Sequence, residues 1–348
     1  MFNFTSRRIA SLTAATVWLV SACGSAPAPE KTANDAPQTP PAETAAAAQV
    51  EEKAAPQPAG APAPETTVAV AAAAAPAPEP EPEPVAVNGG WVFKKKLPAV
   101  GASALEKEST AMGMNMSITP KAGAKAEKLV MVDNAKIERT VEVLAVSADA
   151  VTKVKVSYKS YETTKTKNGA DEPGKVSLAG KSYVVEAAGG TTTVTTADGG
   201  APPADEVKAV KKQFKSLGRP DSLSKALPDT PIKVGDRVDS VAEGLKDRIK
   251  EDEGGKEKVT VSKAVVKLTA VKDTPAGKVG VFEYSFDLAI DVQIMVVKMP
   301  AKGVAEIRIR DGAPLHITMK APLTISGSSV GKVTGTGQAD MSMTREMK

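Results

Sequence analysis

The sequence predicts an α+β fold dominated by antiparallel strands and preceded by an extended, low-complexity leader. Three observations support this prediction. Apolar and polar residues alternate with period two through much of the C-terminal part, as in strands with one buried and one wet face. Turn sequences rich in Gly and Asp separate these runs. Alanine and proline, in contrast, fill 36 of the 67 positions from 24 to 90.

The first 22 residues have the pattern of an export signal. Arg7 and Arg8 precede a run of twelve uncharged residues, and small residues follow that run. A basic start, a short apolar stretch and small residues at the end are typical of a secretory signal peptide. The apolar stretch is too short for an ordinary transmembrane helix. We therefore assign residues 1–22 to a signal peptide.

Cys23 is the only cysteine of the chain. A single cysteine excludes an intramolecular disulfide and any metal site built from several cysteines. The segment Val20-Ser21-Ala22-Cys23 resembles the lipobox of bacterial lipoproteins. The resemblance implies cleavage before Cys23, a diacylglyceryl thioether on its sulfur, and acylation of its new amino group with a palmitate-type chain. Two or more acyl chains give stable membrane anchoring.

The resemblance also implies a location in the cell envelope. In such lipoproteins an aspartate after the lipidated cysteine retains the protein at the inner membrane, and this chain has Gly24 there. The expected site is therefore the outer membrane, with the protein facing the periplasm or the cell surface. The alternative is a plain secretory signal with an incidental cysteine, although a free thiol is a liability in an exported protein.

Residues 23–90 are expected to form a disordered tether behind the lipidated cysteine. The segment from 24 to 90 has two lysines against nine acidic residues and no aromatic residue. It cannot bury enough apolar surface to offset the entropy of ordering, and its prolines and like charges favour extended conformations. The tether is interpreted as a spacer. A leader without any length requirement and a proline-rich ligand for a partner are the alternatives.

Residues 91–348 are expected to form a single β-rich domain. Strand-like alternation is clearest at Met112, Met114 and Met116, at Val154 and Val156, and in the threonine-rich stretch 191–196. Apolar residues at spacings of three and four predict helices over 205–217 and over 239–250. A weak repeat with a shift of 125 residues leaves open two similar halves, at about 105–200 and 257–348.

Beyond the lipobox, the layout resembles an uncharacterised group of bacterial lipoproteins with a spacer and a strand-rich domain. The segment from Leu227 to Asp236 and the closing strands to Met347 carry this part of the resemblance. More loosely, the pattern is similar to the half-barrels with internal helices of periplasmic lipoprotein carriers and lipid-binding lipoproteins. It implies a curved sheet or half-barrel with one or two helices, and by itself no activity.

The sequence offers no catalytic, cofactor or metal site. His316, the only histidine, lies in a strand pattern far from any nucleophile signature. A Gly-x-Ser-x-Gly elbow and a phosphate-binding glycine loop are both missing from the sequence. Acidic clusters such as 251–253 adjoin glycines, as solvated loops do. We therefore expect a protein that is not an enzyme.

The methionines suggest a binding surface. Met is flexible and polarizable, and it suits adaptable apolar surfaces. One hypothesis is an apolar cavity lined by Met112, Met114, Met116, Met341 and Met343, and the alternative is ordinary core packing.

Three functions remain open from sequence alone. The first is an envelope lipoprotein with a non-enzymatic binding or structural domain. The second is a carrier of lipid or another hydrophobic ligand, and the third is an uncatalogued hydrolase. Expected partners are the bilayer, through Cys23, and a hydrophobic ligand or envelope component. Nucleic acid is not expected, because an exported chain with so few aromatic residues lacks stacking platforms for bases.

Overall fold

The computed structural model describes residues 83–120, 125–171, 176–221, 225–251, 258–291, 295–328 and 331–348. The proposed signal peptide, Cys23 and nearly all of the proposed tether lie outside these ranges. The predictions made for them therefore remain predictions.

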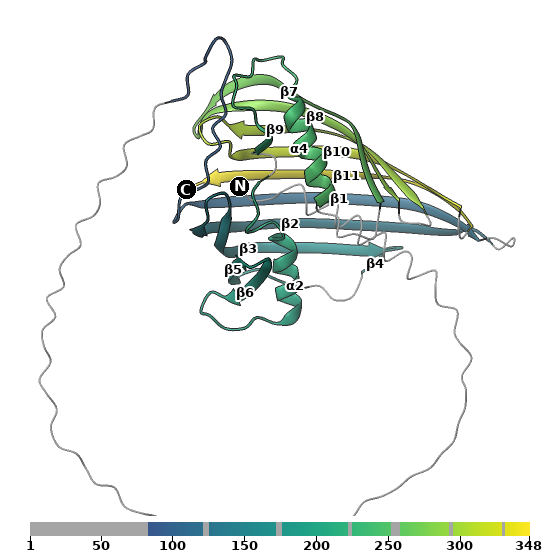
Figure 1. Cartoon of the computed structure of the whole chain (residues 1–348). Helices are drawn as coiled ribbons and strands as arrows, with labels where there is room; N and C mark the ends of the chain where they lie inside the picture. Colours follow the sequence, from purple (N-terminus) through teal and green to yellow (C-terminus); the bar gives the residue numbers. More distant parts are fainter. Residues whose placement is uncertain are drawn as a thin grey trace, which may run out of the picture. The chain divides into compact units, whose positions relative to one another are not determined.

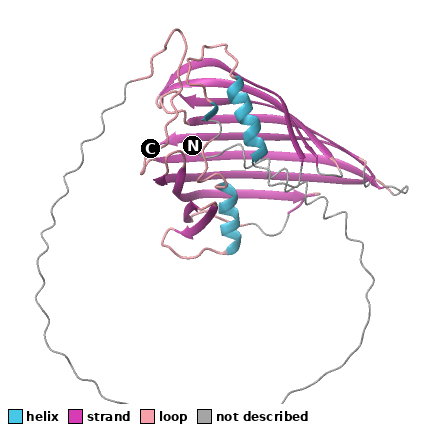
Figure 2. Cartoon of the chain, viewed as in Figure 1, coloured by secondary structure: helices cyan, strands magenta, loops and turns pink. Residues whose placement is uncertain are grey.

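Eleven strands and two helices make up the described chain (Figures 1 and 2). The strands are β1 (Ser103–Pro120), β2 (Glu127–Val146), β3 (Val151–Lys167), β4 (Ala170–Asp171), β5 (Ser182–Ala188), β6 (Thr191–Thr196), β7 (Lys258–Thr274), β8 (Gly277–Asp291), β9 (Val296–Arg308), β10 (Pro314–Gly327) and β11 (Gly331–Met347). The helices are α2 (Ala204–Gln213) and α4 (Asp239–Glu251). None of the described helices is long and apolar enough to cross a membrane.

All strands belong to one antiparallel sheet in the order β6-β5-β3-β2-β1-β11-β10-β9-β8-β7, with β4 beside β3. Neighbouring strands follow each other in sequence except for β3 and β5, which β4 separates in the chain, and at the centre, where β1 pairs with β11. The pairing runs from Ala104 opposite Met347 to Pro120 opposite Gly331. β6 and β7 consequently lie at opposite edges, and the chain between them has to cross the sheet.

One face of this sheet is buried and mostly apolar, and we call it the inner face. On β8 the residues Phe282, Tyr284, Phe286, Leu288 and Ile290 are buried on this face, and their alternate neighbours point outward. Both helices belong to the crossing segment and lie on the same side of the curved sheet (Figure 1). The predicted fold class is therefore confirmed: a mostly antiparallel, curved β-sheet with two helices.

Both predicted helices are present, but the first is shorter than expected. The second runs over Asp239–Glu251, close to its expected bounds. The first ends at Gln213 instead of residue 217, because Phe214 leaves helical geometry with φ −123°. Phe214 and Leu217 are still buried, within tight turns that lead to Gly218 at φ 78°. Their spacing therefore marked buried positions correctly but extended the helix too far.

The chain that follows the proposed tether is fixed to the crossing segment by Trp91 and to the sheet by Phe93. The backbone of Trp91 exchanges two hydrogen bonds with Ile232, at 2.8 and 2.9 Å. The Phe93 ring is buried with its centroid 5.2 Å from that of Phe282. Gly280 makes room for it, since a Cβ there would lie 2.4 Å from the Phe93 ring.

The valines of the weak repeat lie in corresponding hairpins but pair differently. Val141 of β2 faces Val156 of β3. Their counterparts at the 125-residue shift are Val266 of β7 and Val281 of β8, and Val266 faces Tyr284 instead. The existence of two similar halves stays a prediction.

Gly303 permits the closest packing on the inner face. It lies opposite Tyr284 on β8 and Met319 on β10. A Cβ at Gly303 would lie 2.1 Å from the backbone oxygen of Thr318 and 2.4 Å from the Tyr284 ring. The Tyr284 hydroxyl donates a 2.8 Å hydrogen bond to that same Thr318 oxygen. The aromatic ring thus covers the glycine backbone.

We predict that Gly303→Ala destabilises the sheet, because the new methyl group would overlap a backbone carbonyl that cannot move independently. Overpacking of this kind costs about 1–3 kcal/mol in the free energy of unfolding. Gly113→Ala is the matched control, since a Cβ there meets nothing within 4 Å. Urea unfolding of both variants checks the difference, and equal midpoints would contradict the packing described for Gly303.

Candidate functional site

Along strand β1 the inner face changes from charged to apolar. Its inward positions are, in order, Ala104, Glu106, Glu108, Thr110, Met112, Met114 and Met116. Successive inward side chains of a strand stand on the same face, two residues apart. The strand therefore passes from carboxylates through one hydroxyl to methionines, and the neighbouring strands continue both parts.

The five methionines expected to line a cavity gather in one buried apolar cluster. Met114, Met116, Met341 and Met343 are 2–5% exposed, and Met112 is partly buried. Across β1 and β11, Met341 faces Thr110 and Met343 faces Glu108. The structure thus brings these residues together, and four of them are packed as core residues.

A line of small residues runs along β11 beside the methionines of β1. Ala339 faces Met112, Gly337 faces Met114, and Gly335 faces Met116. We call these three residues the small-residue lane. All three are partly exposed, whereas Met114 and Met116 next to them are buried. On the other side of the lane β10 contributes the buried side chains Ala321, Leu323 and Ile325.

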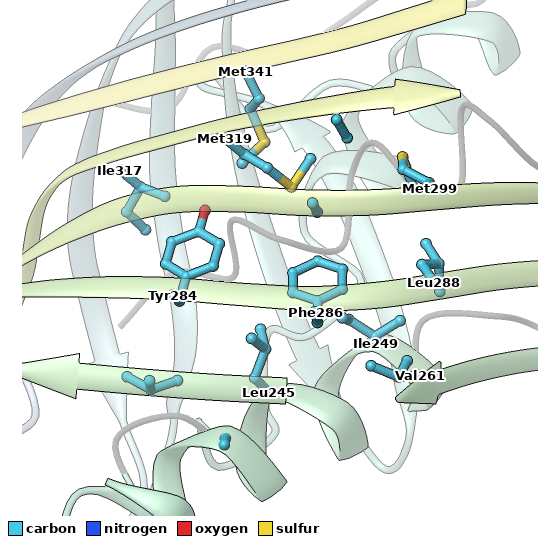
Figure 3. Close-up of a cluster of buried hydrophobic side chains, with 14 of the residues drawn as sticks. Leu245, Ile249, Val261, Tyr284, Phe286, Leu288, Met299, Ile317, Met319 and Met341 are labelled. Atoms are coloured by element: carbon cyan, nitrogen blue, oxygen red, sulfur yellow. The ribbon is translucent and has the colours of Figure 1, made fainter. Parts of the chain in front are cut away.

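Helix α4 covers the part of the inner face formed by β7 and β8. Its Leu245 and Ile249 point toward Phe286 and Val261 (Figure 3). Met299, Met319 and Met341 approach the same cluster from β9, β10 and β11 (Figure 3). The flexible side chains of these three methionines thus lie between the aromatic residues of β8 and the central strands.

Buried charges, which the sequence analysis did not foresee, lie on the inner face beside the methionines and beside a second apolar cluster formed by β2, β3, β5 and the residues of α2. Glu106 is 2% exposed and accepts hydrogen bonds from two guanidinium groups. Its Oε2 accepts from Arg139 of β2 at 2.6 and 2.8 Å, and its Oε1 accepts from Arg345 of β11 at 2.5 and 3.2 Å. Glu108 lies 3.8 Å from Arg139. We call these four residues the charged cluster.

The charged cluster is electrically balanced, because two carboxylates face two guanidinium groups. Burial disfavours the charged form of Arg139, but Glu106 and Glu108 outweigh this effect and raise the pKa of its guanidinium above the ordinary value. A buried ion pair of this type contributes little net stability compared with apolar packing, but removal of one partner is expensive.

Polar contacts at both ends fix helix α2 over β2, β3 and β5. At its end, Gln213 Oε1 accepts hydrogen bonds from Arg139 at 2.7 Å and from Tyr158 at 2.8 Å. Near its start, Glu206 accepts from Lys181 and Tyr183, and these bonds lower the pKa of Glu206. The stabilisation from Glu206 is therefore present above its ordinary pKa and is lost as the pH falls through the lowered one.

The remaining candidate residue lies away from these groups. His316 is half-buried on β10 between Glu306 of β9 and Thr344 of β11, and its neighbour Ile317 is the one that faces inward. In the part of the chain that the structure describes, no group of three His, Cys, Asp or Glu side chains is placed to hold a metal ion.

The alternation of β1 contained a signal for the charged cluster. Glu106 and Glu108 have the same parity as Met112, Met114 and Met116, so the strand pattern already places them on one face. Their partners Arg139 and Arg345 could not be identified, because the cross-strand register is set by contacts distant in sequence.

Comparisons with known proteins give only weak structural similarities. No family model matches the sequence, and the curated proteins contain no match to it. Among solved structures, one described as lipid–protein interactions in lipovitellin matches with a TM-score of 0.29 at 4% identity. That match covers 70% of this chain and 25% of the lipovitellin chain.

A second solved structure is a DUF1329 family protein from Desulfovibrio piger, with a TM-score of 0.12 and 10% identity. It covers 67% of this chain and 83% of that chain. Neither superposition is close enough to transfer an activity, a ligand or a partner. The candidate site therefore has to be interpreted from its own geometry.

We predict that Glu106→Gln strongly destabilises the body, since it removes the carboxylate that both buried guanidinium groups bind. Breaking a buried pair costs about 3–5 kcal/mol in the free energy of unfolding. Glu138→Gln is the control, because its partner Lys159 is 74% exposed and such surface pairs contribute less than about 1 kcal/mol. Similar denaturation midpoints for the two variants would refute the structural role of the charged cluster.

Proposed function

We propose that this chain is a lipid-anchored protein of the cell envelope whose β-rich body binds a hydrophobic ligand on the inner face of the sheet. The anchor is the acylated Cys23, and the chain from 24 to 90 serves as the tether. No catalytic step is part of this proposal.

One observation supports ligand binding more than any other. The small-residue lane is partly exposed while the methionines beside it are buried. Side chains of the neighbouring strands lean over the lane, since a Cβ at Gly335 would lie 2.8 Å from Met116 Cγ and one at Gly337 would lie 3.1 Å from Leu323 Cδ1. A guest would therefore take the place of movable side chains. Methionines can also rearrange around guests of different shape, because they are unbranched and flexible.

The anchor predicts that Cys23→Ala releases the protein from membranes. Without the sulfur of Cys23 no thioether forms, and no acyl chain can be attached through it. Cell fractionation and detergent phase separation provide the measurement, with Ser25→Ala as a neighbouring control. A Cys23→Ala protein that still partitions entirely with the membrane would show that something other than this cysteine holds it there.

The binding surface predicts uptake of lipid by the purified chain. Organic extraction followed by mass spectrometry should recover co-purified lipid, and a fluorescent acyl probe should bind. Ala339→Leu places a larger side chain in the small-residue lane, where it competes with the acyl chain, and should weaken probe binding about tenfold, or about 1.4 kcal/mol.

Gln338→Leu is the matched control for this experiment, because it adds a leucine at the exposed neighbouring position. It should leave probe binding unchanged. Absence of both co-purified lipid and probe uptake in the parent chain would favour a purely structural body over a ligand-binding one.

A further inference from the structure

The hydroxyl of Thr110 is the inward polar group that the site described so far does not use. Thr110 is 7% exposed, and its Oγ1 has no hydrogen-bond partner among the described residues. An unsatisfied buried hydroxyl is unusual in a native protein and calls for a water or ligand partner. Its position at the boundary between charged cluster and methionines is where an amphipathic molecule would change from polar to apolar.

We infer that the inner face binds an esterified acyl chain, with the ester carbonyl accepting a hydrogen bond from Thr110 and the hydrocarbon lying along the small-residue lane. The inference rests on the proposed function and adds to it the chemical class and the orientation of the ligand.

The register of β1 and β11 places the hydroxyl at the end of the lane. Thr110 faces Met341, the next inward residue after Ala339, and on its other side it faces the small residue Ala135. From Gly335 to Met341 the strand rises about 20 Å at roughly 3.3 Å per residue. That length accommodates a long acyl chain that ends at Thr110.

The lane has a width suited to one hydrocarbon chain. Strands in a sheet lie about 4.8 Å apart, so small residues on one strand allow the side chains of its two neighbours to lean over it. A Cβ at Gly335 would lie 2.8 Å from Met116 Cγ, and one at Gly337 would lie 3.1 Å from Leu323 Cδ1. An acyl chain in the lane therefore has to displace these two side chains. Here the borders are Met112, Met114 and Met116 of β1 and the buried apolar residues of β10. Both borders are apolar, so an acyl chain in the lane would contact hydrocarbon and thioether groups.

We place the entry point of the acyl ligand beside Met112. This residue lies next to Thr110 on the inner face and is partly exposed, as is Met131, which faces Met114 from β2. Both methionines pack against the buried apolar cluster. Rotation of two long unbranched side chains would open this position without any displacement of a strand.

The balance of the charged cluster favours a neutral ester over an ionised fatty acid. Both guanidinium groups already bind Glu106, and the cluster has two positive and two negative charges. A ligand carboxylate beside Glu108 would be buried without a compensating charge, which is highly unfavourable. An ester carbonyl needs only one hydrogen-bond donor, and Thr110 supplies one.

The test uses the full chain with Cys23→Ala, so that its own acyl groups cannot compete. Displacement of a fluorescent acyl probe measures the binding of 1-oleoylglycerol, of oleate at a pH where it is ionised, and of a long-chain alkane without a carbonyl. Thr110→Val removes the hydroxyl and keeps the volume, Thr110→Ser keeps the hydroxyl, and Ser109→Ala on the outer face is the control.

We expect 1-oleoylglycerol to bind the parent chain more tightly than oleate does. Thr110→Val should weaken 1-oleoylglycerol about three- to tenfold, as expected for one lost hydrogen bond, and leave the alkane unchanged. Thr110→Ser and Ser109→Ala should behave like the parent. The melting temperature of Thr110→Val without ligand should be equal or higher, because an unsatisfied polar group is removed.

Two results would overturn the inference, and they differ from failure of the proposed function. Equal binding of 1-oleoylglycerol by the parent and Thr110→Val, or tighter binding of oleate, would show that the hydroxyl does not receive an ester carbonyl. If the parent binds none of the three compounds, ligand binding on the inner face is wrong altogether.

Discussion

The constraint on which this structure depends is that a single large sheet has one apolar face to keep from water. The central pairing of β1 with β11 sends β6 and β7 to opposite edges, so the segment that joins them must pass over that face. Its two helices bring apolar residues to the sheet, α2 over the β3–β5 region and α4 over β7 and β8. Topology thus supplies the cover, and the helices need only be amphipathic.

The charged cluster links the central strands of the sheet to helix α2. A single carboxylate, Glu106, joins β2 and β11 across β1, and Arg139 extends the contact to Gln213 of helix α2. Each guanidinium group donates two hydrogen bonds to one oxygen of Glu106, and charge-assisted hydrogen bonds of this kind add geometric specificity to the apolar pattern. The cluster therefore specifies which strands meet and where α2 rests, and the methionine part of the face remains adaptable.

The sequence predicted the class of fold and the position of the methionines, but not the arrangement of the charges. Period-two alternation was sufficient for Met112, Met114 and Met116, and spacing by three and four was sufficient for the residues 239–250 of helix α4. The end of α2 was missed because Phe214 is buried from a turn, which the same spacing also permits. The partnership of Glu106 with Arg345 spans 239 residues, and local periodicity contains no information on such pairs.

The central pairing also sets an order on folding. β1 is synthesised first of the eleven strands and β11 last, yet the two are neighbours over seventeen residue pairs. Contacts so distant in sequence are slow to form, because the entropy of closing the loop is lost before any contact repays it. Until β11 emerges, β1 has a free edge toward the missing strand, and Glu106 lacks one of its two guanidinium partners. Under the export proposed above, the central pairing cannot form before β11 has been made, so the sheet stays incomplete while the earlier strands leave the ribosome.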